Sequence, residues 1–315
     1  MERKCVGEPL ISVVMPTYNY GHLIEESITS VLNQTHQNVE LIVVDDGSTD
    51  NTEATVKELA AKDDRIVYIK ISNSKNPTAR NTGFLAAKGD YIATIDSDDL
   101  WPREKLDHQL KVLKDNPDAI VLGNVRRFYV DKNGAIQWTT TTHLPSLSGD
   151  YVHNVMSMAT NQMVHFNTLL ARAEIIKKEG LWDPLVVTAH DWENWIRLAK
   201  KYSFVHLDEI LQFYRKHEKS KTVQNSMNLA LYYQLMVVNR HSPKGAAGFL
   251  RRLRYKRLRY EEAIDGMIYQ RRPSEAAKLL ARAALNSNVL FKADFFRRVK
   301  EVVVLFFRSR RHLDV

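Results

Sequence analysis

Cysteine is almost absent from this sequence of 315 residues, which contains only Cys5. One cysteine cannot form an intramolecular disulfide, and it cannot build a cysteine-based metal cluster. A reducing compartment is therefore expected, and we predict a cytoplasmic protein. The N-terminal residues also lack the apolar stretch of a secretory signal peptide, which agrees with this prediction.

Long apolar runs are missing as well. The longest strongly apolar run late in the chain extends from Val302 to Phe307, whereas a membrane-spanning helix needs roughly 20 apolar residues. No helix is therefore expected to cross a bilayer. The composition, with 44% hydrophobic and 26% charged residues, is typical of a folded globular protein.

Basic charge gathers at the C-terminal end of the sequence. Residues 241–315 contain 18 Lys and Arg against 7 Asp and Glu, a net charge of +11, whereas residues 1–240 contain 27 against 30, a net charge of −3. Such a segment favours an anionic partner, either a membrane surface or nucleic acid. Because no nucleic-acid-binding motif accompanies the charge, no nucleic acid is expected as partner.

Apolar runs alternate with helix-like spacing over the first hundred residues. Pro16 is expected to end the first strand. The alternation predicts an α/β fold with a mostly parallel central sheet flanked by helices on both faces. The expected strands are Ile11–Met15, Val39–Val44, Ile66–Ile71 and Tyr91–Ile95, and helices are expected at Thr52–Ala61 and Thr78–Ala87.

The remaining sequence changes character near residue 222. Up to that point strands and helices mix, with a loop expected at Thr139–Ser148 and a helix at Asp191–Tyr202. We therefore predict an α/β domain at residues 1–222 and a basic helical C-terminal region at residues 223–315. The helices expected in this region are Met227–Asn239, Ala246–Gln270, Ser274–Leu285 and Phe291–Arg308.

Two acidic clusters follow strands of the predicted sheet. Asp45-Asp46 follows the second strand, and the run from Asp96 to Asp99 follows the fourth. Since ligands bind beyond the carboxyl ends of parallel strands, both clusters should face one crevice. Carboxylates this close repel one another unless a cation lies between them, and Mg²⁺ typically bridges carboxylates to a substrate's phosphates. Capping of the following helix is the alternative role for either cluster.

Three further side chains have two interpretations each. Tyr18 could stack on a nucleobase or be an ordinary half-buried aromatic residue. Arg80, with Lys75 nearby, could bind phosphate oxygens or be a solvated helix arginine. His217 could complete a metal or diphosphate site, or lie in a solvated loop.

Taken in order, these segments resemble the family 2 inverting glycosyltransferases. The resemblance is dense over about the first hundred residues and scattered from there to Ser220. It implies the GT-A type, Rossmann-like fold, here with a C-terminal helical extension. The matching segments are VVMPTYN (13–19), SVLNQT (30–35), ELIVVDDGSTD (40–50), ARNTG (79–83), GDYI (89–92) and DSDD (96–99).

The resemblance also implies roles for individual residues. It implies a nucleotide-diphosphate sugar as donor and Mg²⁺ or Mn²⁺ as cofactor, which would neutralise the leaving diphosphate. The metal ligands would be Asp98, Asp96 and His217. The donor-binding residues would be Pro16, Thr17, Tyr18, Asp45, Asp46, Arg80, Asp96 and Ser97.

Inversion requires a base that removes the proton of the acceptor hydroxyl. In the family this base is an acidic residue that opens a helix after a loop, and Asp191 aligns with it. His190 stands where an acidic residue is common, so Glu193 is the alternate base. Asp191 is also expected to serve as the N-cap of its helix.

The resemblance implies a saccharide or lipid-linked acceptor, in cell-surface polysaccharide or glycolipid biosynthesis. The last helix, with Phe291, Phe295 and Val299 at helical spacing among basic residues, is expected to contact an anionic membrane surface. The protein would then be peripheral on the inner face of the membrane. A core-facing stripe is favoured for the basic helix around residues 251–260.

Two other functions stay open. A sugar nucleotidyltransferase would share this style of fold, but residues 16–21 are not the Gly-rich phosphate loop that such an enzyme usually has after its first strand. A module that binds nucleic acid or membrane without catalysis would explain only the basic tail. The Gln-x-x-Arg-Trp signature of processive synthases is absent, so one sugar is expected to be added per encounter.

Overall fold

The computed structural model describes residues 7–74, 77–143, 151–157, 165–186, 188–217, 227–270, 272–286 and 297–304. The chain divides into two compact units. One comprises Met1–Val155 and Gln162–Ser220, and the other comprises Met156–Asn161 and Lys221–Val315. The domain boundary at residue 222 stays a prediction from the sequence.

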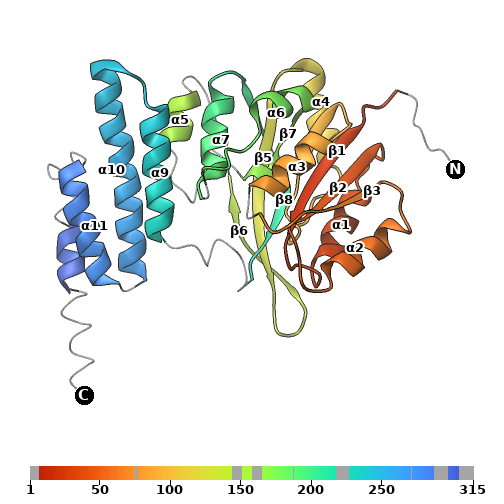
Figure 1. The fold of residues 1–315 in the computed structure, drawn as a ribbon, viewed down its shortest axis with the longest axis horizontal. Coiled ribbons are helices and arrows are strands. Elements are labelled where there is room, and N and C mark those ends of the chain that lie inside the picture. Colours follow the sequence, from red (N-terminus) through yellow and green to blue (C-terminus); the bar gives the residue numbers. More distant parts are fainter. Residues whose placement is uncertain are drawn as a thin grey trace. The chain divides into compact units, whose positions relative to one another are not determined.

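A sheet of eight strands forms the first unit, counted over the described residues (Figure 1). The strand order is β3-β2-β1-β4-β7-β5-β6, and β8 pairs with β5. The pairs β1–β2, β1–β4, β2–β3 and β5–β8 are parallel, whereas β7 and β6 join in antiparallel pairs. The strands are β1 Ile11–Thr17, β2 Val39–Asp45, β3 Ile66–Lys70, β4 Tyr91–Thr94, β5 Ile120–Val130, β6 Ile136–Thr142, β7 Leu170–Arg172 and β8 Phe204–Arg215.

Helices cover both faces of this sheet, as the alternating pattern predicts. The helices that precede β8 in the chain are α1 Ile24–Leu32, α2 Thr52–Ala60, α3 Thr78–Ala86, α4 Lys105–Asp115, α5 Tyr151–Ser157, α6 Ala173–Glu179 and α7 His190–Ala199, with a short 3₁₀ helix, η2, at Phe166–Thr168. On one face, Val13 and Met15 of β1 join the core that includes Ile28 of α1 and Leu106 of α4. On the other face α3 lies against β1 and β2 through Gly83. The predicted fold class is therefore confirmed.

The expectation that Pro16 ends the first strand is wrong. Strand β1 extends to Thr17, and Pro16 lies opposite Val44 of β2. The pairing of β1 with β4 stops at Val14. Beyond that point β1 is an edge strand on its β4 side, where a residue without an N–H group is tolerated.

The loop expected at Thr139–Ser148 is also partly wrong. The run from Thr139 to Thr142 belongs to β6, which pairs with β5. Threonine is β-branched and fits a pleated strand well, so a Thr-rich run need not be a loop. Residues 144–148 lie outside the described residues.

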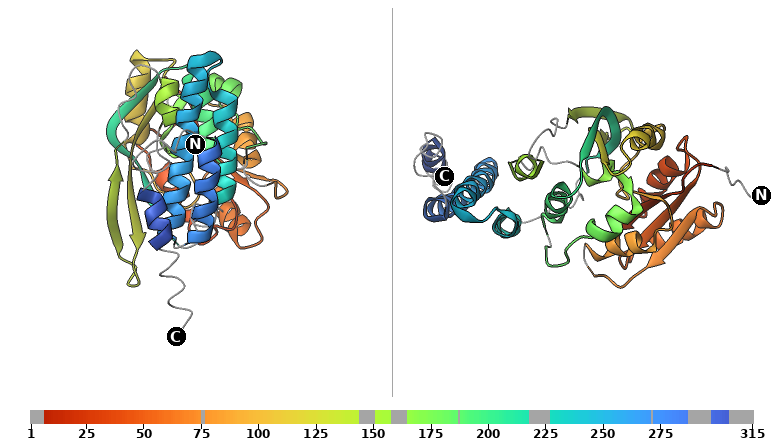
Figure 2. Two further views of the ribbon diagram at one scale, coloured as in Figure 1. Left: turned by 90° about the vertical axis from the view of Figure 1, so that its left-hand side faces the viewer. Right: turned by 90° about the horizontal axis from the view of Figure 1, so that it is seen from above.

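Three long helices form most of the described part of the second unit: α9 Met227–His241, α10 Gly245–Tyr269 and α11 Pro273–Asn286. They lie side by side, as the views in Figure 2 show. Tyr260, Ile264 and Met267 of α10 form a core with Leu279 and other apolar residues of this unit. The three helices predicted over these residues are confirmed.

The last helix is described only over residues 297–304. There Val299 packs against the core of the second unit, whereas Val303 is exposed. Arg298 donates two hydrogen bonds of 2.7 Å to Asp265 of α10. Phe291, Phe295 and Phe306 lie outside the described residues. Over the described residues, none of the helices has the length and apolar character needed to span a bilayer.

Candidate functional site

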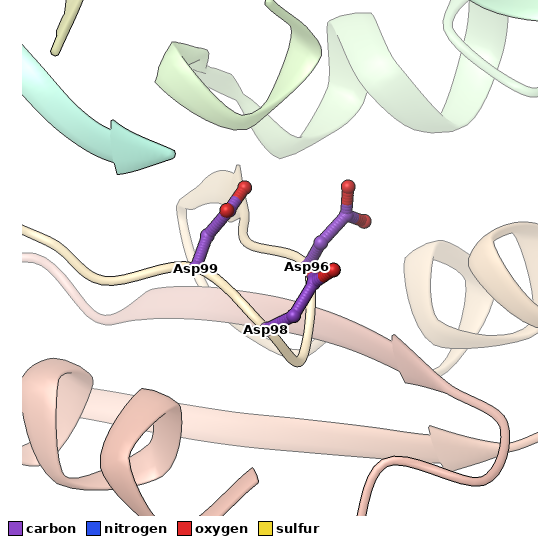
Figure 3. A group of neighbouring side chains, drawn as sticks. All are labelled: Asp96, Asp98 and Asp99. Carbon is purple, nitrogen blue, oxygen red and sulfur yellow. The ribbon is translucent and has the colours of Figure 1, made fainter. Parts of the chain in front are cut away.

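The loop after β4 presents three carboxyl groups close together. Asp96, Asp98 and Asp99 each offer an oxygen, and these oxygens lie within 4.8 Å of one another. Figure 3 shows that the carboxyl group of Asp99 points toward the end of β8, away from that of Asp98. The three side chains therefore differ in what they can bind.

Asp99 anchors the loop. It is fully buried, and its Oδ1 accepts a 3.0 Å hydrogen bond from the backbone N–H of Arg215 on β8. Its Oδ2 accepts a hydrogen bond from the side chain of Gln212. Burial, followed by the charges of Asp98 and Asp96, raises the pKa of Asp99 well above its usual range. Both of its oxygens are therefore bonded to β8, which ties the acidic loop to that strand.

Asp96 is held by two donors from different elements. Nη2 of Arg80 on α3 donates a 2.5 Å hydrogen bond to its Oδ1, and Nδ2 of Asn167 in η2 donates a 2.7 Å bond to its Oδ2. The Arg80 side chain is only 4% exposed, and its guanidinium carbon lies 4.4 Å from the ring centroid of Trp182. The solvated alternative for Arg80 is therefore wrong. Lys75 lies outside the described residues.

The side chains of His217 and Tyr20 lie near Asp98, although the two residues are far apart in the sequence. Nε2 of His217 lies 3.0 Å from Oδ2 of Asp98, and the charge of Asp98 acts on the Tyr20 hydroxyl. Burial and the charges of Asp98 and Asp96 raise the pKa of Tyr20. Tyr20 was not among the residues predicted from the sequence, although it lies one position beyond the VVMPTYN segment. The ring of His217 meets the ring of Tyr20 edge-on at 5.7 Å.

These residues fit a hard divalent cation. His217 Nε2 and Asp98 Oδ2 lie 3.0 Å apart, at hydrogen-bond distance, so a nitrogen and an oxygen donor are close together here. The carboxylates of Asp96 and Asp98 supply the oxygen ligands that Mg²⁺ and Mn²⁺ prefer. The helix-cap alternative for this loop is wrong, because α4 begins at Lys105 after the N-cap residue Glu104.

The acidic pair after β2 is fixed by its own loop. Oδ1 of Asp45 accepts a 2.7 Å bond from the N–H of Ser48, and Oδ2 accepts a 2.6 Å bond from the Tyr68 hydroxyl. Oδ1 of Asp46 accepts hydrogen bonds from the N–H and the hydroxyl of Ser74. The N–H that α2 offers at its first residue, Thr52, is bound by Asp50 instead. The pair therefore orders the edge of the sheet without capping α2.

The residues that follow β1 line the same edge. The N–H of Asp46 donates to the carbonyl of Thr17 at 2.9 Å, so the ends of β1 and β2 are joined. Thr17 is buried, and its Oγ1 has no hydrogen-bond partner among the described residues. Pro16 and Tyr18 are half-buried, and Ser97 in the acidic loop is buried.

Asp191 lies in the first turn of α7. The helix begins at His190, and its N-cap residue, Ala189, has the left-handed φ of 65°. The N-cap role expected for Asp191 is therefore wrong, because the left-handed residue already turns the chain into the helix. The Asp191 side chain is 47% exposed, and Nε2 of His190 lies 3.9 Å from its Oδ1, which is enclosed and has no hydrogen-bond partner among the described residues.

The surroundings of Asp191 shift its ionisation. Burial raises the pKa of Asp191, and the charge of Asp96 adds to this effect. The charges of His190 and Arg80 act in the opposite direction. Asp191 is thus near enough to Arg80 and Asp96 for their charges to affect its pKa.

Glu193, the alternate base, has a different role in the helix. Its side chain is 2% exposed, and both of its oxygens accept from Nε of Arg197, at 2.9 and 3.0 Å. Arg197 also donates to the carbonyl groups of Glu179 and Leu181. Glu193 therefore connects α7 to the end of α6, and this ion pair occupies its carboxylate.

Comparison with known sequences finds a family and many relatives. The model of "Glycosyl transferase family 2" matches residues 12–174. An uncharacterized glycosyltransferase of Rickettsia typhi is 29% identical over 234 residues, which covers 72% of this chain and 70% of the relative. One of Nostoc sp. is 30% identical over 239 residues, covering 75% and 68%. A Rickettsia conorii relative is 32% identical over 214 residues, but these make up only 33% of its length.

Comparison with solved structures identifies the fold. S. aureus TarS in complex with UDP-GlcNAc has a TM-score of 0.62 and 17% identity, over 94% of this chain and 89% of that chain. The mannosyltransferase PcManGT from Pyrobaculum calidifontis, in complex with GDP-Man and Mn²⁺, has a TM-score of 0.58 and 18% identity, over 98% and 88%. The fold is thus of the GT-A type. With the family match over residues 12–174, the chain belongs to glycosyltransferase family 2.

Proposed function

We propose that this glycosyltransferase is an inverting, metal-dependent enzyme, which transfers a sugar from a nucleotide-diphosphate sugar to an acceptor hydroxyl. The observation that carries this proposal is that Asp96 and Asp98 lie close together with His217 at Asp98, while the charges of Asp96 and Arg80 act on Asp191. Asp96, Asp98 and His217 can hold a cation that binds a diphosphate. Asp191 offers a partly exposed carboxylate with a raised pKa.

The donor is proposed to lie along the carboxyl ends of β1, β2 and β4. Thr17, Tyr18, Asp45 and Asp46 would bind the nucleoside, since buried carboxylates and an unpartnered hydroxyl are suited to its polar groups. Arg80 would act through Asp96, which it orients by an ion pair. The relatives of known structure carry UDP-GlcNAc or GDP-Man, and a donor of this class is consistent with the site.

The cation is proposed to be held by Asp98, Asp96 and His217. A divalent cation there would stabilise the negative charge that develops on the leaving diphosphate. Mg²⁺ and Mn²⁺ both fit ligands of this kind. The Mn²⁺ in the Pyrobaculum calidifontis mannosyltransferase makes manganese the first ion to test.

Asp191 is proposed as the general base. Its carboxylate would take the proton of the acceptor hydroxyl while the hydroxyl oxygen attacks the anomeric carbon opposite the diphosphate. The bond between that carbon and the diphosphate oxygen breaks, and the nucleoside diphosphate leaves with the bonding electrons. The product then has the inverted anomeric configuration and Asp191 holds one proton. The left-handed Ala189 turns the chain into α7 just before Asp191.

The acceptor is proposed to be a saccharide or a lipid-linked saccharide at an anionic membrane surface. On α10 the exposed side chains of Phe249 and Leu250 lie next to the basic residues Arg252 and Arg254. Exposed apolar side chains beside cations suit the interface of an anionic bilayer. Such contact would bring the enzyme to membrane-bound acceptors of cell-surface polysaccharide or glycolipid biosynthesis.

A thermal-shift screen of nucleotide sugars, with and without Mn²⁺, tests the donor and the cation together. We expect one nucleotide sugar to raise the melting temperature, and to do so more strongly with Mn²⁺. Product analysis then separates transfer from the alternative of nucleotidyl transfer. Release of a nucleoside diphosphate supports the proposal, whereas release of pyrophosphate would rule it out.

A further inference from the structure

Arg127 on β5 is a charged residue with neutral partners. Its Nη1 donates to the hydroxyl of Thr142 on β6, and its Nη2 lies 3.3 Å from Nε2 of His165. Its guanidinium carbon lies 5.9 Å from the ring centroid of Tyr214 on β8. These four residues are called the Arg127 cluster below.

The Arg127 cluster contains one positive charge and no negative charge. A guanidinium can only donate, so Nε2 of His165 must accept with its lone pair, and the imidazole is neutral. Burial, followed by the charge of Arg127, lowers the pKa of His165 to about 4, which keeps it neutral at pH 7. No ion pair found in the described part of the chain includes Arg127.

Three other arginines of the same unit have acidic partners. Arg80 pairs with Asp96, Arg197 with Glu193, and Arg215 with Glu26. Arg127 is half-buried as well, and a partly desolvated charge without a counter-ion costs free energy. Its fork of N–H donors matches a carboxylate or a phosphate group. The cluster thus has the chemistry of an anion-binding site.

The Arg127 cluster adjoins the carboxylates of the acidic loop. His165 immediately precedes η2, whose Asn167 donates to Asp96, and the charge of Asp96 also acts on His165. Tyr214 lies near enough to Tyr20 to influence the ionisation of its hydroxyl, as the charges of Asp98 and Asp96 also do. An anion held by Arg127 would therefore be a close neighbour of the reacting groups.

We propose that Arg127 binds an acidic group of the acceptor, a phosphate or a carboxylate, next to the hydroxyl that receives the sugar. This inference rests on the proposed function, because it needs the donor at the acidic loop. A cation held by Asp98, Asp96 and His217 would bind the donor's diphosphate there, as proposed above. The positive charge of the Arg127 cluster is left for the second substrate.

The neighbouring residue provides a matched control. Arg126 is also half-buried, but its guanidinium carbon lies 4.5 Å from the ring centroid of Trp138, apart from the cluster. Arg126→Gln removes the same charge from the same strand. Any effect of Arg127→Gln that Arg126→Gln lacks therefore belongs to the cluster and not to the net charge of the protein.

The test is a calorimetric titration of the full chain with Mn²⁺ and saturating UDP, repeated with GDP. The probes are methyl glucoside, methyl glucuronide and glucose 6-phosphate, which differ in their acidic group. We expect one acidic probe to bind at least about tenfold more tightly than the neutral probe. Arg127→Gln should remove this preference, and Arg126→Gln should keep it. The acidic probe that binds more tightly identifies the group on the acceptor.

Several results would overturn the inference. The inference fails if all three probes bind equally to the unmodified protein. It also fails if the preference for an acidic probe survives Arg127→Gln, or if Arg126→Gln loses the preference to the same extent. Arg127→Gln could also lose Mn²⁺-dependent affinity for UDP by as much as it loses affinity for the acidic probe. That result would assign Arg127 to the donor's diphosphate instead. If Arg127→Gln does not fold, Arg127→Lys replaces it, and a partial loss of the preference is expected because the fork is removed.

The titration also separates this inference from the proposed function. Absence of Mn²⁺-dependent binding of nucleotides and nucleotide sugars would contradict the proposed function. With nucleotide binding present and no preference for an acidic probe, only the anion site on Arg127 is refuted.

Discussion

Asp98 is the carboxylate whose surroundings best suit a cation. Nε2 of His217 lies 3.0 Å from its Oδ2, and its charge acts on the Tyr20 hydroxyl. We expect Asp98→Asn to weaken Mn²⁺-dependent binding of the nucleotide sugar at least about tenfold, or about 1.4 kcal/mol, because an amide loses the charge that attracts the cation. Titration of Mn²⁺ followed by thermal shift measures this loss, and chelation of the metal should reproduce it.

Asp99 provides the control for that substitution. Asp99 belongs to the same loop as Asp98, but its oxygens are bonded to Gln212 and to the N–H of Arg215. Asp99→Asn should therefore lower the free energy of unfolding by about 1–3 kcal/mol while the response to Mn²⁺ stays. The metal assignment fails if Asp98→Asn keeps its full response to Mn²⁺.

Asp191→Asn tests the base directly. Without a carboxylate to accept the proton, kcat should fall by about 10²- to 10⁴-fold, and binding of the nucleotide sugar should persist. The measurement is single-turnover transfer at saturating donor. Glu193→Gln is the comparison: it breaks the ion pair with Arg197 and should reduce stability, with transfer per folded molecule retained. Normal turnover in Asp191→Asn would exclude Asp191 as the base.

The raised pKa of Asp191 predicts the pH dependence of transfer. The base works only as a carboxylate, so kcat/KM should fall tenfold per pH unit below the pKa of folded Asp191. An ordinary aspartate has a pKa of about 3.9, and the acidic limb of the profile should lie above that value. A limb at or below about pH 4 would contradict the shift.

The same shift has a consequence for stability. A carboxyl group whose pKa is higher in the folded state binds more protons there than in the unfolded chain, so it lowers stability as pH rises through the window between the two values. Asp191→Asn should remove this penalty and raise the midpoint of denaturation at neutral pH relative to the unmodified enzyme. Denaturant titrations on both sides of the window provide the check.

The roles of several single residues were predictable because the residue types of a motif indicate its chemistry. The acidic run from Asp96 to Asp99 indicates a cation site, and its position after a strand places it at the edge of the sheet. Partnerships across the fold were not predictable in this way. Asn167 contacts Asp96, and Arg127 contacts His165, over separations of 71 and 38 residues. A local pattern contains no information about such distant contacts.

Elements were predicted well where periodicity and burial agree. The apolar run of β2 and the helical spacing of α3 gave bounds within one residue of those observed. The predictions at Pro16 and at Thr139–Thr142 were wrong because pairing with a neighbouring strand decides whether these residues belong to a strand. Whether proline is tolerated depends on where the neighbouring strand stops, and that is a property of the sheet.

Close packing of α3 on the sheet yields a prediction at this scale. A Cβ atom added at Gly83 would lie 2.3 Å from Cγ1 of Val14 and 3.2 Å from Cγ2 of Val44. Gly83→Ala should therefore lower the free energy of unfolding by about 1–3 kcal/mol, even though alanine favours a helix. Denaturant titration measures the change.

The control lies two residues further along the same helix. Leu85 is 62% exposed, so Leu85→Ala should change stability by no more than about 0.5 kcal/mol. Adding Val14→Ala to Gly83→Ala should recover part of the loss, since it removes the clashing methyl group. An unchanged midpoint for Gly83→Ala would show that α3 moves away from β1 without cost.

At the scale of the whole molecule, charge is divided between the ends of the chain. Residues 241–315 have a net charge of +11, whereas residues 1–240 have a net charge of −3. The acidic clusters that suit a cation belong to one unit and the basic helices to the other. This division is typical of an enzyme whose binding to a surface and whose chemistry are carried by different parts of the chain.

The first turns of α10 give this idea a specific test. Phe249 and Leu250 are 51% and 64% exposed, and Arg252 and Arg254 follow directly. We expect the protein to bind vesicles of phosphatidylcholine with phosphatidylserine, and pure phosphatidylcholine vesicles much less. Each cation near such a surface contributes about 1 kcal/mol. Replacing both, in Arg252→Gln with Arg254→Gln, should therefore weaken binding at least about tenfold.

Vesicle co-sedimentation measures this binding, and the apolar pair is tested in parallel. Phe249→Ala with Leu250→Ala should also weaken binding, because two side chains lose their burial in the bilayer interface. Added salt should weaken vesicle binding more in the unmodified protein than in the variant that lacks Arg252 and Arg254. Tyr269→Ala is the control, since Tyr269 is 90% exposed at the opposite end of α10. Equal binding of all variants would show that the basic charge of this helix serves another purpose than attachment to lipid.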